Sequence, residues 1–188
     1  MKTCVFITGT NGVGKSTLAK ELQDRFGGIL ATRGDVTYCR NGKCAFAGAY
    51  EGQGKYGGVD ALRNERGSSC TSRLTEVVTR AFRTCDVIFC EGMMMHTFGL
   101  NLTNAMFLAE RGFVVFLYAP ATVINERLKN RSNKKVTISI LNKQKATAAS
   151  ARKWAEIGVP VLTYDTSKVD ASDIAEQIIK NIPELCTR

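Results

Sequence analysis

The stretch that decides the fold of this chain covers residues 9–17 and reads, in order, Gly9, Thr10, Asn11, Gly12, Val13, Gly14, Lys15, Ser16 and Thr17. It fits the phosphate-binding pattern G-x-x-x-x-G-K-[ST] at every defined position. Glycines in this pattern allow the backbone to turn tightly and to point consecutive N–H groups at phosphate oxygens. We therefore predict that residues 9–17 bind the phosphates of ATP.

Two side chains of this stretch have distinct chemical roles. In such a loop Lys15 reaches the β- and γ-phosphates as a point charge, and the Ser16 hydroxyl binds Mg²⁺. The flanking sequence fits this reading, because residues 4–7 are apolar like a buried strand and the residues after the stretch keep helical spacing. A helix that begins near Lys15 would direct the positive end of its dipole at the same anion. The sequence thus predicts ATP and Mg²⁺ as cofactors.

The composition predicts a single domain, residues 1–188, that is large enough to bury its own core. The formal net charge of +9 suits a polyanionic partner but does not separate nucleic acid from several bound phosphates. We expect no leader peptide and no membrane span, because the apolar runs are too short. Seven cysteines without C-x-x-C spacing are typical of reduced thiols, so we expect a cytoplasmic protein. The oligomeric state stays open.

Apolar runs alternate with helical patterns along the chain. The runs that resemble buried strands lie at residues 4–7, 29–32, 87–90, 113–118 and 159–164. Strands of this kind, nearly all apolar and separated by helices, are typical of a parallel sheet covered on both faces. We predict a three-layer α/β P-loop fold with a five-stranded parallel sheet, which binds its ligands at the carboxyl ends of the strands.

Residues 36–68 interrupt this alternation, since they are rich in glycine and aromatic residues and have no long apolar periodicity. Asn41-Gly42 lies between two short strand-like segments and is the strongest short-range signal of a β-hairpin. We interpret 36–68 as an inserted hairpin and a glycine-rich loop on the substrate side. Its aromatic residues are candidate stacking surfaces for a base, and they are Tyr38, Phe46, Tyr50 and Tyr56.

Three carboxylates are candidates for chemistry at the ends of the strands. Glu91 directly follows a predicted strand, where it could hold Mg²⁺ or orient the acceptor. Asp35 follows the second predicted strand, and Asp60 lies in the glycine-rich loop. Either aspartate could accept the proton of an acceptor hydroxyl during phosphoryl transfer, and the sequence does not decide between them. We assign to the substrate site Asp35, Tyr56, Asp60 and Glu91.

The stretch from 127 to 153 is strongly basic, because it holds nine Lys and Arg residues and no Asp or Glu. A solvated helix normally mixes the signs of its charges, so one-sided charge beside a nucleotide site indicates a lid that closes over phosphates. Arg127 and Arg131 are four residues apart, share one helix face and can converge on one phosphate chain. We predict that both bind ATP and that Arg127, with Lys15, stabilises the transition state.

The whole set of features resembles the small P-loop kinases. These features are the phosphate loop, the acidic end of the second predicted strand, Glu91-Gly92 and the helix with Arg127 and Arg131. The resemblance covers nearly the whole chain and is most specific in the phosphate loop. It implies an ATP-dependent phosphotransferase with a hydroxyl acceptor.

Shorter features narrow this resemblance. Residues 57–60 and 91–93, with Asn142 and Lys145 downstream, resemble bacteriophage kinases that phosphorylate 5-hydroxymethyluracil in DNA. The position of Asp35 also looks like that of an acidic residue in polynucleotide kinases. These resemblances imply DNA as the substrate and, for a phage-encoded protein, a location in the host cytoplasm.

Two other functions remain open on the sequence. A kinase of free nucleosides or nucleoside monophosphates would use the same phosphate-binding residues, although the D-R-[YH] segment expected of thymidylate kinases is absent. A nucleotide-binding regulatory module without phosphoryl transfer would need only the phosphate loop. The N-K-x-D segment by which G proteins recognise their base is also absent, because residues 142–145 read N-K-Q-K.

Overall fold

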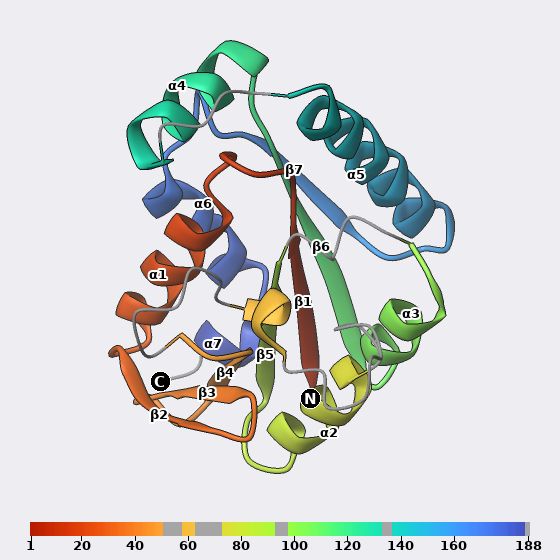
Figure 1. The fold of residues 1–188 in the computed structure, drawn as a ribbon. Coiled ribbons are helices and arrows are strands. Elements are labelled where there is room, and N and C mark those ends of the chain that lie inside the picture. The colour runs from red at the N-terminus through yellow and green to blue at the C-terminus, as the bar shows by residue number, and fades with distance from the viewer. Residues whose placement is uncertain (51–57, 63–72, 93–97, 133–136, 187–188) are drawn as a thin grey trace.

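The computed structural model describes residues 1–50, 58–62, 73–92, 98–132 and 137–186 of the chain. These ranges form an α/β structure (Figure 1). The strands are β1 (Thr3–Thr8), β2 (Ile29–Arg33), β3 (Val36–Cys39), β4 (Cys44–Ala47), β5 (Val87–Glu91), β6 (Arg111–Tyr118) and β7 (Val161–Asp165). The helices are α1 (Lys15–Arg25), the short 3-10 helix η1 (Gly58–Ala61), α2 (Leu74–Phe82), α3 (Leu100–Met106), α4 (Ala121–Ser132), α5 (Ile138–Glu156), α6 (Ala171–Lys180) and α7 (Pro183–Cys186).

The strands form one mixed sheet in the order β2-β3-β4-β5-β1-β6-β7. β1 is the middle one of the parallel strands and pairs with β5 and β6, so that Val5 stands between Phe89 and Phe113. β4 extends the sheet beside β5, and β7 extends it beside β6, both in parallel. The predicted α/β P-loop class is confirmed. The predicted count of five strands is too low, because antiparallel β3 and β2 add to β4.

The strand beside β5 is β4, and the segment at 29–32, predicted as a strand of the parallel sheet, is not parallel to its neighbour. That segment forms β2, an antiparallel edge strand in which every residue is partly or fully exposed. All residues of β4 are fully buried, as a strand covered on both faces requires. The predicted turn at Asn41-Gly42 is too short for a crossover, so β3 and β4 form an antiparallel hairpin. The hairpin is therefore part of the sheet and not an insertion beside it.

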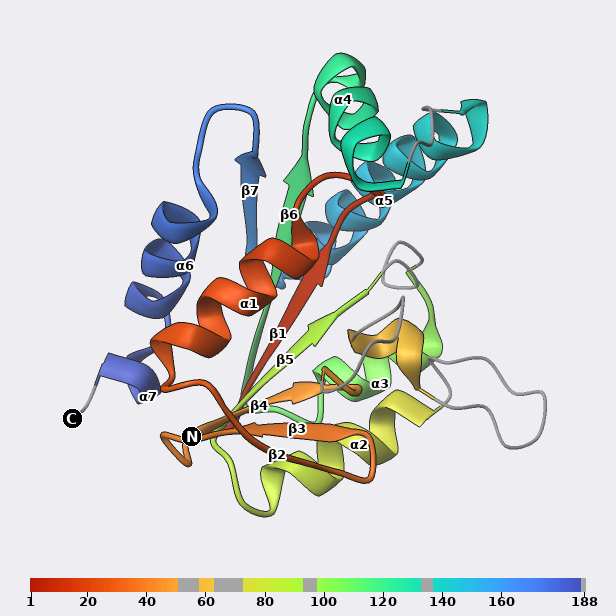
Figure 2. The ribbon, with the colours of Figure 1, turned by 60° about the vertical axis from the view of Figure 1, so that its left-hand side comes forward.

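Helices cover both faces of the sheet, as Figures 1 and 2 show together. α1 and α6 lie side by side on one face, where Leu22 and Ile178 share a core with Val5 of β1. α2, α3 and α5 lie on the other face, where Trp154 of α5 shares a second core with Phe6. Neighbouring residues of β1 thus enter opposite cores. This arrangement explains why β1 has no polar alternation in the sequence.

Trp154 attaches α5 firmly to the sheet. It is fully buried, and its ring meets Phe6 edge-on with 5.7 Å between centroids and Phe98 edge-on with 4.9 Å. Truncating a buried tryptophan to alanine typically costs about 3–5 kcal/mol of folding free energy.

Among the described residues, none of the helices has the length and apolar character to cross a bilayer.

Candidate active site

The phosphate loop connects β1 to α1 at the carboxyl end of the central strand. Gly9 has a φ of 154°, and a Cβ placed there would come within 2.5 Å of the Leu117 carbonyl oxygen and 2.7 Å of Val13. Gly14 has a φ of 93° and is the residue from which α1 begins. Both positions therefore require glycine. The first turn of α1 presents its N–H groups at this end of the sheet, as an anion site requires.

Lys15 is buried within the loop, with 8% of its surface exposed. Its Nζ donates hydrogen bonds to the carbonyl oxygens of Gly9, at 2.9 Å, and Thr10, at 3.1 Å. Burial lowers the pKa of the ammonium below its usual value, and the charges of Glu91 and Asp60 oppose that change. The ammonium is thus held in the centre of the loop with two carboxylates close by.

Glu91 ends β5 next to the phosphate loop, in register with Ile7 of β1. It is 3% exposed, and both of its carboxylate oxygens accept hydrogen bonds. Ser16 Oγ donates to Oε1 at 3.3 Å, and Tyr50 Oη donates to Oε2 at 3.2 Å. Burial raises the pKa of this carboxyl, whereas Lys15 and the two hydroxyl donors lower it. The structure therefore brings together Ser16 and Glu91, the two residues predicted to hold Mg²⁺.

Asp60 lies beside Glu91 on η1. The Asp60 Oδ1 atom is 3.0 Å from where a Cβ on Gly92 would stand, so a larger residue at 92 would crowd this carboxylate. The charge of Asp60 raises the pKa of both Lys15 and Glu91, which shows that it acts on the same centre. Asp60 is thus a second carboxylate at the phosphate loop.

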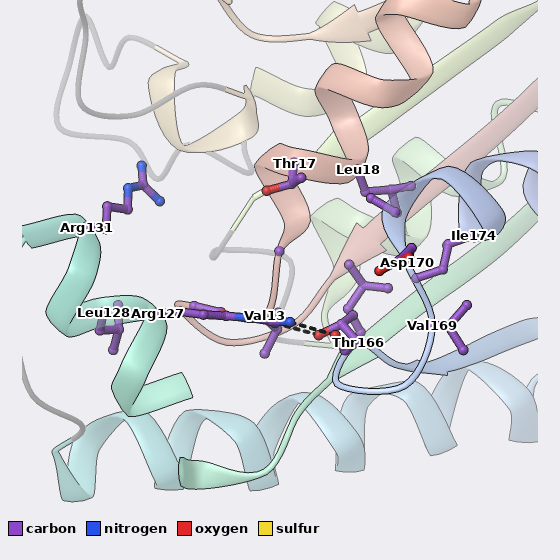
Figure 3. A pocket seen from close by; sticks show the side chains of 14 residues that line it. Val13, Thr17, Leu18, Arg127, Leu128, Arg131, Thr166, Val169, Asp170 and Ile174 are labelled. Atoms are coloured by element: carbon purple, nitrogen blue, oxygen red, sulfur yellow. Dashed lines mark hydrogen bonds between the residues drawn. The ribbon is translucent and has the colours of Figure 1, made fainter. Parts of the chain in front are cut away.

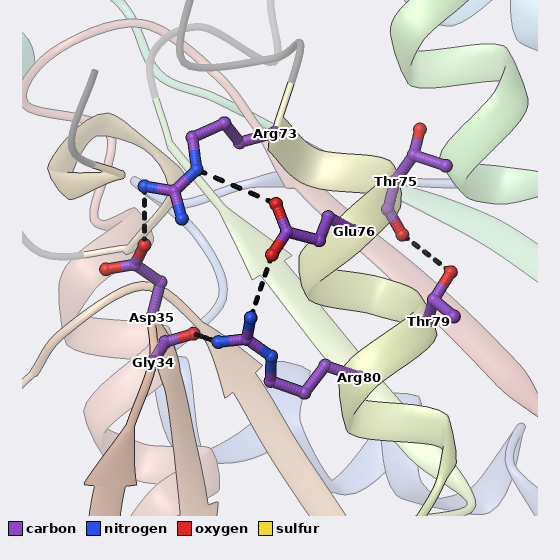
Figure 4. Close-up of polar contacts among 7 residues, drawn as sticks. All are labelled: Gly34, Asp35, Arg73, Thr75, Glu76, Thr79 and Arg80. Carbon is purple, nitrogen blue, oxygen red and sulfur yellow. Dashed lines mark hydrogen bonds and ion pairs between the residues drawn. The ribbon is translucent and has the colours of Figure 1, made fainter. Parts of the chain in front are cut away.

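Asp35 lies in a different environment, in the turn between β2 and β3 (Figure 4). Its φ is 65°, and its Oδ2 is 3.0 Å from Nη1 of Arg73, just before α2. Glu76 is 3.9 Å from Arg73 and 2.8 Å from Arg80, which in turn donates to the Gly34 carbonyl at 2.6 Å. The Asp35 side chain therefore takes part in an ion-pair network that fixes the β2–β3 turn to α2.

A cavity of about 360 Å³ lies beside the phosphate loop, on the face that carries α1 and α6. Figure 3 shows its side chains, which come from the loop, α1, β6, α4, α6 and the segment between β7 and α6. Its lining is mainly apolar and includes Val13, Leu18, Leu128, Val169 and Ile174. Mainly apolar cavities of this size with a few polar groups are typical of sites for small ligands and cofactors.

Arg127 lines this cavity, and Figure 3 shows its guanidinium bonded to Thr166. Its guanidinium donates to Thr166 Oγ1 at 2.8 Å, to the Thr166 carbonyl at 2.6 Å and to the Gly12 carbonyl at 3.4 Å. Arg131 lies one turn further along α4 and is exposed, and its charge lowers the pKa of Lys15. Both arginines thus line the cavity, with Arg127 bonded to the phosphate loop and to Thr166, and Arg131 near enough for its charge to act on Lys15.

Residues 5–149 match the sequence profile of a known protein family, which is described as AAA domain. The chain belongs to this family. The matched part of the AAA domain runs from β1 into α5 and includes the phosphate loop, Glu91, Arg127 and Arg131. None of the curated proteins compared with the chain matches it.

Solved structures with a similar fold include small kinases. A sugar kinase from Janibacter sp. superposes with a TM-score of 0.59 at 17% identity, with 100% of both chains covered. The YorR protein of Bacillus subtilis, solved with phosphorylated GDP, has a TM-score of 0.55 at 15% identity and covers 96% of this chain and 95% of its own. Deoxyadenosine kinase from M. mycoides has a TM-score of 0.50 at 12% identity and covers 96% and 98%. At such identities the likeness shows the fold alone.

Most described residues of the basic stretch 127–153 lie on two helices, α4 and α5, which contact different parts of the structure. Its second part belongs to α5, which packs on the sheet through Trp154 and contacts the phosphate loop, where Thr10 Oγ1 donates to the Ile140 carbonyl at 3.3 Å. Gln144 also donates to the Ala119 carbonyl after β6, at 3.1 Å. The described part of α5 is thus bonded to the phosphate loop and to the segment after β6, and a lid formed by residues 127–153 stays a prediction.

The donor atoms at the loop suit Mg²⁺ bound with a nucleotide. Nucleotide-bound Mg²⁺ usually takes one or two protein oxygens and fills its octahedron with water and phosphate oxygens. Ser16 Oγ and Glu91 Oε1 provide such a pair, 3.3 Å apart. Within the ranges that the structure describes, no cluster of three or more His, Cys, Asp or Glu residues could hold a metal by itself. The AAA domain thus offers a site for Mg²⁺ that arrives with its nucleotide.

The aromatic residues predicted to stack on a base have different positions in the structure. Phe46 is fully buried and stacks on Phe89 with 4.9 Å between centroids, so it belongs to the core and is not available to a base. Tyr50, which the sequence marked only as a stacking candidate, contacts Glu91 through its hydroxyl. Tyr56, assigned to the substrate site, lies outside the described residues.

Proposed function

We propose that the protein is an ATP-dependent kinase that transfers the γ-phosphate to a hydroxyl of a nucleoside or nucleotide. The observation that carries the proposal is the pair of carboxylates beside Lys15. Glu91 shares a hydrogen bond with Ser16 and suits the metal, whereas Asp60 stands on a separate element. A nucleotide-binding module needs only the first carboxylate, but a kinase also needs a group that accepts the acceptor proton. We assign that role to Asp60.

The reaction follows from these positions. The adenine enters the cavity beside Arg127, and the triphosphate lies along the loop N–H groups. Lys15 exchanges its bonds to the Gly9 and Thr10 carbonyls for the β- and γ-phosphate oxygens. Bound Mg²⁺ supplies positive charge at the β- and γ-oxygens. Arg131 adds positive charge near the transferring group.

The chemical step is an in-line displacement. The acceptor oxygen forms a bond to the γ-phosphorus as the bond from that phosphorus to the bridging oxygen of ADP breaks. The acceptor proton passes to Asp60, and ADP leaves with the bonding electron pair. Asp35 is the second candidate for the base, but its oxygen is 3.0 Å from the Arg73 guanidinium. Asp60 lies beside Glu91, and its charge acts on Lys15, whereas Asp35 lies in the turn between β2 and β3, so we assign Asp60 first.

Small acceptors are favoured by the kinds of protein that share this fold. The similar structures include a sugar kinase and a deoxyadenosine kinase, whose acceptors are small molecules by their descriptions. Free nucleosides and nucleoside monophosphates are therefore the acceptor class that we propose first. In this proposal residues 1–188 act as one kinase domain, and the protein works in the cytoplasm.

A hydroxymethyl group of 5-hydroxymethyluracil in DNA is the second candidate acceptor. It rests on the net charge of +9 and on the resemblance of 57–60 and 91–93 to phage DNA kinases. Lys145, Arg152 and Lys153 are exposed along α5 and could track a phosphate backbone. A base in a duplex would have to leave the helix to reach the loop.

An acceptor panel with γ-labelled ATP and Mg²⁺ tests the proposal. The panel holds nucleosides, nucleoside monophosphates, sugars, unmodified DNA and DNA that contains hydroxymethyluracil. We expect label in a free nucleoside or nucleotide. Label that enters only the modified DNA would favour the second candidate. Tight ATP binding without transfer to any acceptor would favour the regulatory module and contradict the proposal.

A further inference from the structure

Both oxygens of the Glu91 carboxylate have a defined partner. Oε1 faces Ser16 of the phosphate loop, and Oε2 accepts the hydrogen bond of Tyr50, from the segment that follows β4. Burial and the nearby Glu91 charge raise the pKa of the Tyr50 phenol well above its usual value, so this hydroxyl remains a donor at neutral pH. The two donors approach the carboxylate from different elements and therefore fix its rotation.

Tyr50 is itself held against the strand that carries Glu91. Its ring meets Phe46 edge-on, with 5.5 Å between centroids, and Phe46 stacks on Phe89 with 4.9 Å. Phe89 is two residues before Glu91 on β5. The Tyr50 hydroxyl is thus positioned by ring contacts that run through Phe46 to Phe89, on the same strand as its acceptor Glu91.

The backbone of η1 closes over this hydrogen bond. Gly58 has a φ of 68°, and a Cβ there would collide with the Glu91 carbonyl oxygen and would stand 3.0 Å from Tyr50 Oη. Two residues further along, η1 carries Asp60, whose charge disfavours the ionised form of Glu91. A Glu91 side chain without its Tyr50 contact would be free to turn one oxygen away from Ser16.

We propose that Tyr50 is a positioning residue that holds one oxygen of Glu91 toward Ser16 and so prepares the site for nucleotide-bound Mg²⁺. The hydroxyl acts through Glu91 and touches neither the metal nor the transferring phosphate. Its contact keeps the two carboxylates in separate roles, with Glu91 at the metal and Asp60 at the acceptor. The inference rests on the proposed function only in taking Mg²⁺ with ATP as the ligand.

Tyr50→Phe tests this inference, because it removes the hydroxyl and keeps the ring on Phe46. ATP binding is measured by titration calorimetry with and without Mg²⁺, and the gain in affinity that Mg²⁺ gives is compared with wild type. We expect ATP alone to bind as it does to wild type, and the gain in ATP affinity that Mg²⁺ gives to fall about 10-fold. This is the lower end of the loss in metal affinity that follows when a metal ligand loses its hydrogen-bond partner. Tyr164→Phe is the control, since it also removes a phenol from a buried ring, on β7.

A double-mutant cycle with Glu91→Ala separates positioning from general damage to the fold. In the Glu91→Ala background, Tyr50→Phe should change the Mg²⁺ gain by less than about 2-fold, because the group that it positions is gone. An equal loss in both backgrounds, or a Mg²⁺ gain in Tyr50→Phe equal to wild type, would overturn the inference. If the cycle behaves as expected but no acceptor is phosphorylated, the proposed function fails and the role of Tyr50 stands.

Discussion

Replacing Arg127 by alanine should weaken ATP binding and leave the chemical step nearly unchanged. The guanidinium forms one wall of the base cavity and is fixed by Thr166 and the Gly12 carbonyl. A guanidinium on an aromatic ring contributes about 0.5–2 kcal/mol. A loss of about 1.4 kcal/mol raises the Kd for ATP about 10-fold. We expect kcat to stay within about 3-fold of wild type, because the phosphates contact other groups.

The same variant should also be less stable without ligand. Its hydrogen bonds join α4 to the segment after β7, and a hydrogen bond that involves a charged group contributes about 1.5–3 kcal/mol. Calorimetric titration with ATP, steady-state kinetics and the apo Tm are measured together, with Arg131→Ala as the matched variant. For Arg131→Ala we expect a fall in kcat. A kcat loss of about 100-fold in Arg127→Ala with unchanged Kd would refute this reasoning, since it would place Arg127 at the transferring phosphate.

Three further variants test the remaining roles. Lys15→Ala should lower kcat about 10³-fold with an unchanged circular dichroism spectrum, because it removes the charge at the transferring phosphate, and near wild-type turnover would exclude that role. Asp60→Asn should lower kcat by about 10²-fold or more, because it removes the group that accepts the proton. Asp35→Asn should mainly lower the Tm, because it breaks the ion pair with Arg73. A large loss of kcat in Asp35→Asn with a small one in Asp60→Asn would exchange the two roles. Glu91→Gln should make the apo protein more stable at about pH 7. Burial raises the pKa of Glu91 in the folded protein above the unfolded value of 4.5, so the wild-type protein loses stability as the pH rises above that value. Glutamine cannot ionise and therefore removes this loss. That gain should vanish at about pH 4 in urea titrations, and a gain that is the same at both pH values would contradict it.

The phosphate loop and Glu91 could be predicted from the sequence, because local constraints fix them. The spacing from Gly9 to Ser16 specifies a strand, a tight turn and a helix, and these three elements form β1, the loop and α1. Glu91 ends an apolar run that belongs in the sheet centre. Since the ends of parallel strands meet at one edge, its place beside the loop follows from the fold class.

The acceptor side could not be predicted in the same way, because it depends on strand pairing. The segments at 29–32 and 44–47 are both short and mainly apolar, and only the fold shows that the second one lies beside β5. Because β4 and not β2 lies beside β5, Asp35 is in the turn between the outer strands β2 and β3. Asp60 lies beside the phosphate loop. The Tyr50 contact with Glu91 joins residues 41 positions apart, and no local pattern indicates it.

Phosphorus NMR of the complete reaction tests the central claim most directly. The wild-type protein is incubated with ATP, Mg²⁺ and a mixture of nucleosides and nucleoside monophosphates, and the signals are followed with time. Transfer to a hydroxyl predicts that a new phosphoester signal on the acceptor grows as the γ-phosphate signal of ATP disappears and ADP appears. Release of inorganic phosphate alone, or ATP that stays intact with every acceptor, would contradict the assignment of the protein as a kinase.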